Sequence, residues 1–417
     1  MVPNGWKAIT LGDLVTDSAF GPRFSSNLYS ENGAIGTIRT TDLCDEGTIN
    51  YNTIPYANLD IDEFKSHILD SGDLLITRSG TCGIPCIFEK QDKPIIAGAF
   101  LIRFKLKSDV DASYLHYLLK YDVTQHHISK MASGGVQKNL TGTSLKKLKL
   151  EVPEHREQRK IAKILSKWDK AIVTTERLID NSKQQKKALM QQLLTGKRRL
   201  LDESGKPFEG EWEEVKLGDL SSKVTKGTTP STNGFSFQQD GINFVKVESI
   251  SSSGRFDRSK FAYIDNDCYE SFKRSQLEKD DILFSIAGAL GRTALVDETI
   301  LPANTNQALA IVRLNRSRTV HRYIIYFLNS PRIASVIKGL TAKAAQPNLS
   351  LKDVNGLTIL LPSLEEQEKI STALFNADKE IELLEQQLAD LKQEKKALMQ
   401  QLLTGKRRVK VDEEAVA

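Results

Sequence analysis

An identical internal repeat constrains the fold of this chain more than any other feature. The fourteen residues KKALMQQLLTGKRR occupy positions 186–199 and return at positions 395–408, which is 209 residues later. Helix propensity alone does not reproduce a run of this length, so the match indicates duplication, recombination or a docking surface that is used twice. The chain is therefore expected to fold as two copies of one unit, each closed by a long amphipathic helix.

Weaker matches extend this repeat along the whole chain. The first copy opens with Trp6-Lys-Ala-Ile-Thr-Leu-Gly-Asp-Leu14, and the second opens with Trp212-Glu-Glu-Val-Lys-Leu-Gly-Asp-Leu220. The motif Gln137-Lys-Asn-Leu-Thr141 returns as Gln346-Pro-Asn-Leu-Ser350, whereas the sequences between these anchors differ freely. A shared frame with variable inserts is expected of two domains that keep one fold and recognise different partners.

Both globular parts are predicted to mix short strands with two helices. Runs rich in β-branched residues and bounded by turn residues predict strands. The strand runs cover residues 34–39, 74–77 and 95–104 in copy one, and 242–247, 282–286 and 309–314 in copy two. The helical segments lie near residues 112–121 and 123–131, and near 320–329 and 331–338. We therefore expect an α+β fold with two similar α/β domains, each built on a bent sheet.

A long helix is predicted after each globular part. Pro153 and Pro362 are followed by acidic residues, and proline with nearby carboxylates suits a helix N-terminus. Apolar residues then recur at alternating steps of four and three, from Ile161 to Leu193 and from Ile370 to Leu402, which is typical of a coiled-coil seam. Each helix is expected to end at a Thr-Gly pair, where glycine forms the C-terminal cap.

The short connection between the copies restricts how these helices pair. A helix of about forty residues spans ~60 Å, whereas the linker 201–210 reaches at most ~35 Å. The second domain is therefore expected near the far end of the first helix, and the second helix is expected to run back antiparallel to it, with a pseudo-twofold internal repeat. The expected segments are residues 1–152 (first domain), 153–200 (first spacer helix), 201–210 (linker), 211–361 (second domain), 362–408 (second spacer helix) and 409–417 (tail).

Composition and missing motifs exclude several classes of protein. No run approaches the ~20 apolar residues of a membrane span, and the polar start lacks the layout of a signal peptide, so a cytoplasmic protein without membrane contact is expected. The four scattered cysteines favour idle thiols over a disulfide framework or a zinc site. Nucleotide-binding, zinc-protease, nucleophile-elbow and amino-methyltransferase motifs are absent. We therefore expect no catalytic residue, no metal site and no cofactor on this chain.

The positive charge of the chain is concentrated in one segment. The net charge is +5, and residues 154–200 carry thirteen basic against five acidic residues, whereas residues 364–410 carry nine of each. The rest of the chain is therefore slightly acidic, and any nucleic-acid surface on the globular parts must be local. Because phosphate neutralisation dominates affinity for DNA, the affinity of this chain alone is expected to be modest.

Taken in order, the motifs resemble the specificity subunit of type I restriction-modification enzymes. The likeness covers residues 6–408 and rests on the duplicated Gln-x-Asn-Leu-[Thr/Ser], on a proline followed five residues later by glutamine (Pro153 to Gln158; Pro362 to Gln367), and on Leu-Leu-Thr-Gly-Lys-Arg. The resemblance implies a non-catalytic subunit in phage defence, with two target-recognition domains that bind a bipartite double-stranded DNA site. It also implies two methyltransferase subunits that bind S-adenosylmethionine, and restriction subunits with translocase and nuclease activity that use ATP and Mg.

Under this reading, the helix pair acts as a ruler that fixes the number of unread base pairs between the two half-sites. Polar loop residues are the candidate DNA contacts, because arginine suits guanine while glutamine and asparagine suit adenine. The glutamines and asparagines that recur in both copies are expected to hold a turn or contact a phosphate. The full set is Arg23, Ser25, Asn27, Arg39, Thr40, Thr41, Arg78, Ser79, Gln137, Lys138 and Asn139 in copy one, and Lys226, Thr228, Lys246, Glu248, Arg292, Lys343, Gln346 and Asn348 in copy two.

Outward-facing residues of the fourteen-residue repeat are the candidates for docking the partner subunits, one repeat for each partner. They are Gln191, Gln192, Lys197 and Arg198 in copy one, and Gln400, Gln401, Lys406 and Arg407 in copy two. The alternative is that the repeat is only a helix seam with a solvated basic end. Two other functions also stay open: the specificity subunit of a related system whose partner fuses methyltransferase and nuclease, and a scaffold that carries two ligand-binding domains without DNA.

Overall fold

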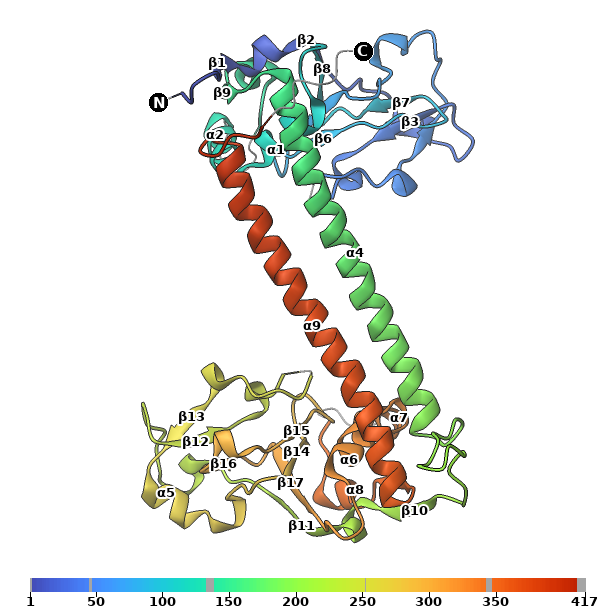
Figure 1. The fold of residues 1–417 in the computed structure, drawn as a ribbon, viewed down its shortest axis with the longest axis vertical. Coiled ribbons are helices and arrows are strands. Elements are labelled where there is room, and N and C mark those ends of the chain that lie inside the picture. Colours follow the sequence, from blue (N-terminus) through green and yellow to red (C-terminus); the bar gives the residue numbers. More distant parts are fainter. Residues whose placement is uncertain (1, 45–46, 133–138, 252, 343–346, 411–417) are drawn as a thin grey trace. The chain divides into compact units, whose positions relative to one another are not determined.

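The chain folds into two compact units that share both long helices. The computed structural model describes residues 2–44, 47–132, 139–251, 253–342 and 347–410. Unit 1 comprises Met1–Glu176 with Gln386–Ala417, and unit 2 comprises Arg177–Glu385. The 39-residue helices α4 (His155–Leu193) and α9 (Leu364–Leu402) each run from one unit into the other (Figure 1). Each unit therefore contains one globular head, the start of the helix that follows this head, and the end of the other long helix.

Head 1, from Lys7 to Val152, contains small sheets and short helices in its described residues. The four-stranded antiparallel sheet has the order β2 (Val15–Phe20), β8 (Leu101–Leu106), β5 (Leu74–Thr77) and β6 (Pro85–Ile87). The three-stranded sheet has the order β4 (Tyr56–Ala57), β3 (Ile35–Ile38) and β7 (Ile95–Ala97), with β3 and β7 parallel. The remaining elements are the pair β1 (Lys7–Thr10) with β9 (Lys149–Val152), and α1 (Ala112–Lys120), α2 (Asp122–Met131) and α3 (Gly142–Lys146).

Head 2, from Glu213 to Leu361, repeats this arrangement. Its four-stranded sheet has the order β11 (Ser221–Lys226), β17 (Leu309–Leu314), β14 (Ile282–Ser285) and β15 (Thr293–Leu295), and its three-stranded sheet has the order β13 (Ala262–Ile264), β12 (Ile242–Val245) and β16 (Ala303–Thr305). The pair β10 (Glu213–Lys216) with β18 (Thr358–Leu361) and the helices α5 (Asn266–Ser271), α6 (His321–Leu328), α7 (Pro331–Thr341) and α8 (Leu351–Asn355) complete it. The internal duplication is therefore a duplication of fold.

The sequence predicted α1, α2, α6 and α7 but not α3, α5 or α8, and it merged strands that the structure separates. The run 95–104 forms two strands, β7 and β8, that belong to different sheets. Gly98 lies between them, where its N–H donates to the carbonyl of Ile38 at 2.8 Å and an added Cβ would lie 2.6 Å from the same oxygen. Because the chain crosses between sheets at this glycine, the expected single bent sheet is wrong, and each head has separate sheets.

In each unit one apolar cluster contains residues of the four-stranded sheet, of the short helices and of both long helices. In unit 1, Leu74 and Phe104 of the sheet lie in one apolar cluster with Leu165 of α4 and Leu402 of α9. In unit 2 the corresponding cluster joins the sheet of head 2 to Leu193 at the end of α4 and to Ile370 and Leu374 at the start of α9. Truncating a fully buried leucine to alanine costs ~2–5 kcal/mol, so both helices are integral to both cores.

The two long helices pair antiparallel within each unit, as predicted. The predicted seam positions, from Ile161 to Leu193 and from Ile370 to Leu402, are all buried or half-buried. In unit 1, Glu157, Asp169 and Glu176 of α4 pair with Arg408, Lys395 and Lys392. In unit 2, Lys183, Lys186 and Arg199 pair with Glu385, Asp378 and Glu366. In both sets, the residue number of the first partner increases while that of the second decreases, as expected of antiparallel helices. No helix in the described ranges has an apolar stretch long enough to cross a membrane.

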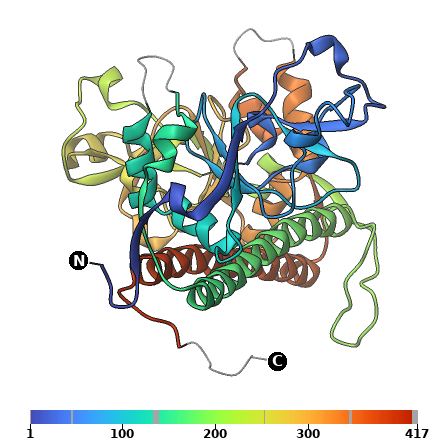
Figure 2. The ribbon, with the colours of Figure 1, turned by 90° about the horizontal axis from the view of Figure 1, so that it is seen from above.

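Both helices end in the predicted glycine cap. Gly196 and Gly405 adopt positive φ values of 69° and 66°, which favour glycine because it lacks a Cβ. The N–H of Arg198 then donates to the carbonyl of Gln192 at 3.2 Å, and Arg407 repeats this bond in unit 1 at 3.1 Å. In unit 1 the segment after α9 passes beside the N-terminal residues (Figure 2), where Arg408 donates to the carbonyl of Asn4.

Candidate nucleic-acid interface

Five strand ends meet at one edge of head 1. The carboxyl end of β2 pairs with the amino end of β8, and so does the carboxyl end of β5. The carboxyl ends of β3 and β7 lie side by side, with Ile38 opposite Ala97. The N–H of Arg78 donates to the carbonyl of Phe100 at 2.9 Å and extends the pairing of β5 with β8. The two sheets meet where β7 passes into β8, and there the N–H of Gly98 donates to the carbonyl of Ile38 at 2.8 Å. The residues that follow these strands, including the candidates Arg39 and Arg78, therefore share one edge of the head.

Arg39 is fixed at this edge by a buried carboxylate. Its Nε and Nη2 donate to Asp42 Oδ2 and Oδ1 at 3.1 and 2.8 Å, and Nη2 also donates to the carbonyl of Thr53 at 2.9 Å. The hydrogen bonds with Asp42 raise the pKa of Arg39 above its ordinary value. Asp42 is buried while the Arg39 side chain is 46% exposed, so the guanidinium is held in place and still reaches solvent. The neighbouring candidates are half-buried Thr40 and exposed Thr41.

Arg78 lies next to two exposed aromatic residues that the sequence analysis missed. Its guanidinium carbon lies 4.3 Å from the ring centroid of Phe20, a distance typical of a cation–π contact. Phe20 and Phe100 are 43% and 56% exposed. Apolar residues at strand ends are usually core residues, so the sequence offered no signal for them. Ser79 forms a β-bridge with exposed Asn139, which completes this edge.

Head 2 builds the same edge from different side chains. Lys226 ends β11 and Lys246 follows β12, in the positions of Phe20 and Arg39. The Nζ atom of Lys246 lies 3.2 Å from Glu248 Oε1 and 5.5 Å from the ring centroid of Phe237. The N–H of Thr228 donates to the carbonyl of Thr305 at 3.0 Å. The frame is therefore shared between the heads, while the donors and acceptors that it presents differ.

Several candidates lie elsewhere or outside the described residues. Arg23, Ser25 and Asn27 are exposed on a loop whose Phe24 ring packs against Tyr29 at a centroid distance of 5.3 Å. Arg292 donates from Nη1 to the carbonyl of Ile250 at 2.6 Å, so its guanidinium tethers a loop. The candidates that fall outside the described residues are Gln137, Lys138, Lys343 and Gln346.

The duplicated Gln-x-Asn-Leu-[Thr/Ser] motif closes the edge in both heads. The N–H of Leu140 donates to the carbonyl of Arg78, and that of Leu349 to the carbonyl of Ile286, both at 2.9 Å. Thr141 and Ser350 then cap α3 and α8 through their hydroxyl groups. The motif thus anchors the next helix to a strand end. Asn139 and Asn348 are exposed.

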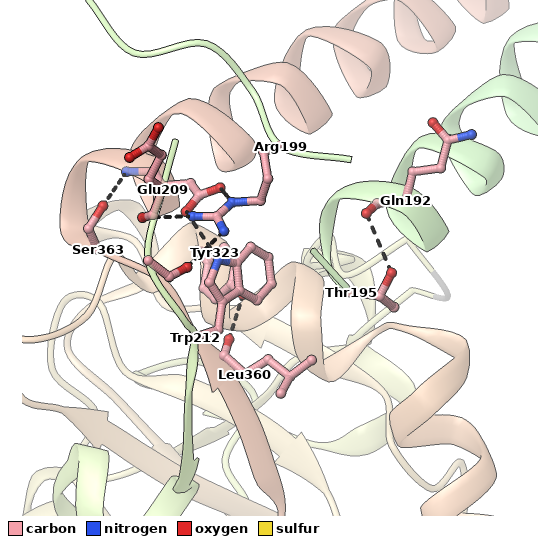
Figure 3. A network of polar contacts seen from close by, with 10 residues as sticks. Gln192, Thr195, Arg199, Glu209, Trp212, Tyr323, Leu360 and Ser363 are labelled. Atoms are coloured by element: carbon pink, nitrogen blue, oxygen red, sulfur yellow. Dashed lines mark hydrogen bonds and ion pairs between the residues drawn. The ribbon is translucent and has the colours of Figure 1, made fainter. Parts of the chain in front are cut away.

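The last arginine of each fourteen-residue repeat clamps the start of the opposite helix. Arg199 donates from Nε and Nη2 to Glu366 at 2.6 and 2.7 Å, and Trp212 Nε1 donates to the same carboxylate at 3.1 Å (Figure 3). Arg408 forms the same bidentate pair with Glu157, with Nε and Nη2 donating to the carboxylate at 2.8 and 2.7 Å. The sequence indicated these glutamates only as helix-start carboxylates, because their partners are far away in the chain.

A second duplicated cluster joins each head to its helix pair. In unit 1, Tyr117 and Lys395 both donate to Asp169 at 2.5 Å. In unit 2, Tyr326 donates to Asp378 at 2.7 Å and Lys186 donates to it at 2.5 Å. Burial, together with the adjacent carboxylate, raises the pKa of both tyrosines well above the ordinary value. The phenols therefore stay protonated and act as donors.

These contacts explain part of the identity between the two repeats. Lysine at the first position and arginine at the last make ion pairs, the leucines at 193 and 402 are buried, and glycine caps the helix. Among the other polar positions, Thr195 and Thr404 donate to the carbonyls of Gln191 and Gln400, and Lys396 pairs with exposed Asp122 at 3.4 Å. All eight docking candidates are exposed: Gln191, Gln192, Lys197, Arg198, Gln400, Gln401, Lys406 and Arg407.

The described residues contain no cluster of three or more side chains that could hold a metal ion. The cysteines are free thiols. Burial raises the pKa of Cys86 to about 12, so this thiol stays protonated near neutral pH and is a poor nucleophile. Donors and aromatic rings at the strand edges suit binding to an extended partner such as a nucleic acid.

Comparison with known proteins identifies similar chains along the full length of this one. The family described as type I restriction modification DNA specificity domain matches residues 3–182 and 209–393. A Methanocaldococcus jannaschii protein named as the type I restriction enzyme MjaX specificity subunit, an assignment that its name marks as provisional, is 27% identical over 98% of this chain and 95% of its own. The MjaVIII specificity subunit of the same organism is 25% identical over 83% of this chain and 81% of its own. The crystal structure of a type I restriction-modification S subunit from M. genitalium shares the fold with a TM-score of 0.59, at 17% identity, over 96% of this chain and 99% of that one.

Proposed function

Because the chain belongs to the family of type I restriction-modification DNA specificity subunits, we propose that its two heads read the two halves of a bipartite sequence in double-stranded DNA. One observation carries this proposal: both heads present the same strand edge, and the two edges carry different side chains. A pair of readers that keep one frame and differ in their contacts suits two different half-sites.

Each edge would read its half-site by donating and accepting hydrogen bonds at base edges in the major groove. Arg39, Arg78 and Asn139 in head 1, and Lys226, Lys246 and Asn348 in head 2, supply donors of this kind. Exposed Phe20 and Phe100 offer apolar surface for a thymine methyl group. Lysine contacts to phosphates would add affinity without sequence information.

In this proposal the chain carries no catalytic residue and recruits the subunits that do the chemistry. Two methyltransferase subunits would bind S-adenosylmethionine, and restriction subunits would use ATP and Mg. The exposed repeat residues Gln191, Gln192, Lys197 and Arg198, with their copies at 400, 401, 406 and 407, are our candidates for docking two copies of one partner. The complex would act in the cytoplasm, where the host methylates its own DNA and meets foreign DNA.

The proposal is tested with the complex of this chain and its methyltransferase subunits. Methylation of a DNA library in which both half-sites and the gap between them are randomised is expected to select two short sequences at one fixed spacing. A gel-shift assay with the chain alone provides the matched control, and weaker binding is expected there. If neither the complex nor the chain alone prefers any sequence, the chain is a scaffold and the proposal is wrong.

A further inference from the structure

The guanidinium of Arg39 is bonded to the protein through Nε and Nη2, while within the described ranges its Nη1 atom is not. Asp42 accepts hydrogen bonds from Nε and Nη2, and the carbonyl of Thr53 accepts the second bond from Nη2. Among the residues that the structure describes, none accepts a bond from Nη1 of Arg39, which keeps two N–H donors. With the side chain 46% exposed, these donors are available to a molecule outside the protein.

Asp42 is itself fully occupied by this arrangement. Its Oδ1 accepts from Arg39 and from the Thr53 hydroxyl at 2.9 Å, while its Oδ2 accepts from the side chain and from the backbone N–H of Arg39, the latter at 2.8 Å. The carboxylate is 1% exposed. A buried carboxylate that is bonded on both oxygens fixes the arginine in one rotamer, so that little conformational entropy is lost when Arg39 binds a ligand.

Head 2 shows that the turn itself does not need this carboxylate. Lys246 occupies the position of Arg39, and Ser249 occupies that of Asp42 at the start of the next short helix. The N–H of Lys246 donates to the hydroxyl of Ser249 at 3.2 Å, so a serine is sufficient to cap this turn. The additional acceptor atoms of Asp42 in head 1 serve the arginine side chain.

Arg103 and Arg313, whose guanidinium groups hold the fold together, are less exposed than Arg39. Arg103 has a side chain that is 5% exposed and donates to Asp17 and to the carbonyl of Ser66. Arg313 is 22% exposed and binds both Asp281 and Glu278. These guanidinium groups are covered by their partners. Arg39 combines a rigid anchor with an open face, and this combination suits recognition of a ligand.

We infer that Arg39 reads a guanine in the half-site bound by head 1, and that Asp42 positions it for this contact. The inference rests on the proposed DNA-reading function. Guanine presents two acceptors, N7 and O6, in the major groove, whereas adenine presents one acceptor beside a donor. The free Nη1 atom can donate to O6 of guanine, at the place where adenine instead presents its N6 donor. Lys246 in head 2 lacks a buried anchor of this kind, because Glu248 beside it is 59% exposed, so this guanine contact belongs to the half-site of head 1.

The test uses the complex of the full chain with its methyltransferase subunits and a DNA library randomised in both half-sites. The wild type is expected to require guanine at one position of one half-site. Arg39→Ala and Arg39→Lys are expected to reduce the preference for that guanine roughly tenfold and to leave the other half-site unchanged. Asp42→Ser installs the cap of head 2 and is expected to weaken the same preference while Arg39 remains.

Lys90→Ala is the matched control, because Lys90 is exposed on the loop before β7 and thus near the opposite ends of these strands. It should leave both half-sites unchanged. Thermal unfolding of every variant is measured in parallel, and the untouched half-site reports whether head 2 and the partners still work. If Arg39→Ala destabilises the fold, the base preference of Arg39→Lys is used instead to decide whether Arg39 reads a base.

Two results would overturn the inference. An unaltered base preference in Arg39→Lys and Asp42→Ser would show that Arg39 does not read a base. An equal loss for all sequences would identify a phosphate contact instead. A wild-type complex without any bipartite preference would refute the proposed function itself, and this outcome is visible before any variant is made.

Discussion

Arg199 and Arg408 occupy the last position of the fourteen-residue repeat, and each binds a buried glutamate at the start of the other long helix. Glu366 and Glu157 are 1% and 4% exposed. A carboxylate at such a site is costly without its partner, because its solvation by water has been lost. At the scale of single residues, the identity of the repeats therefore reflects two equivalent ion pairs as well as a surface that could be used twice.

We predict that Arg199→Ala lowers the free energy of unfolding by about 3 kcal/mol, because the buried carboxylate of Glu366 loses its cation. Replacing both residues with methionine should recover most of this loss. Lys379→Ala removes an exposed ion pair with Glu382, whose side chains are 55% and 42% exposed, and should cost less than ~0.5 kcal/mol. Urea unfolding of the three variants is the measurement, and equal effects of the two alanine variants would contradict this account.

His116 is a second residue whose environment predicts a measurable effect. Burial, aided by Lys120, lowers its pKa to about 4, with Lys395 also lowering it and Asp169 opposing them. Because the unfolded chain binds this proton near pH 6.5, His116 destabilises the fold increasingly as the pH falls from about 6.5 to about 4. Its contribution is constant above this window.

The corresponding residue in head 2 is Ile325, so His116→Ile is the natural variant to test. Between pH 6.5 and pH 4, the free energy of unfolding of this variant is expected to fall by up to ~3 kcal/mol less than that of the wild type. Above pH 6.5 the two proteins should differ only by a constant offset. Urea unfolding at several pH values measures this. A wild type and variant with parallel pH profiles would show that His116 is not responsible.

At the scale of elements, α4 and α9 connect the two units through long antiparallel segments. Each helix has 39 residues and crosses from one unit to the other. Their seam positions are buried or half-buried while their outer faces are charged. Packing along the seam therefore holds the pair together, and the charged faces interact with water. A helix of constant rise is a suitable spacer because its length is set by its number of residues.

Adding one turn to both helices is therefore predicted to lengthen the unread gap of the DNA site. One turn adds ~5.4 Å, and a base pair advances ~3.4 Å, so the preferred gap should grow by one or two base pairs. The insertion is made at residues 176/177 and 385/386, where the units divide. Methylation of sites with different gaps measures the effect, and an unchanged preference would count against the ruler.

At the scale of the whole molecule, the chain order of unit 2 is a circular rearrangement of that of unit 1. Unit 2 runs from the end of α4 through head 2 to the start of α9, whereas unit 1 takes its helix end from the other terminus of the chain. In unit 1, Arg408 binds the carbonyl of Asn4, and Gly405 lies against Pro3. In unit 2 the equivalent Arg199 binds the carbonyl of Gly210 at 2.9 Å, across the ten-residue linker.

A permuted chain should therefore fold. We predict that opening the chain at Ser204 and joining Val409 to Asn4 through a copy of residues 201–210 preserves both the melting temperature and the methylated site. A chain opened between Glu176 and Arg177 is the control, and it should fail because the break interrupts α4. Circular dichroism and methylation assays compare the two. Failure of the first design with success of the second would contradict the unit assignment.

The sequence alone determined the duplication, the two long helices, four of the short helices, the central strands of the larger sheets, the helix seam and the glycine caps, because each depends on residues close together in the chain. It also indicated Arg39 and Arg78 as candidates, since arginine in a polar loop can bond guanine. The tertiary structure decided which of them are anchored, which aromatic rings lie beside them, and that Arg292 is a tether. It also decided that Arg408 meets Glu157, a pair 251 positions apart. No local periodicity encodes such a pair, because the partners come together only when the second helix folds back along the first.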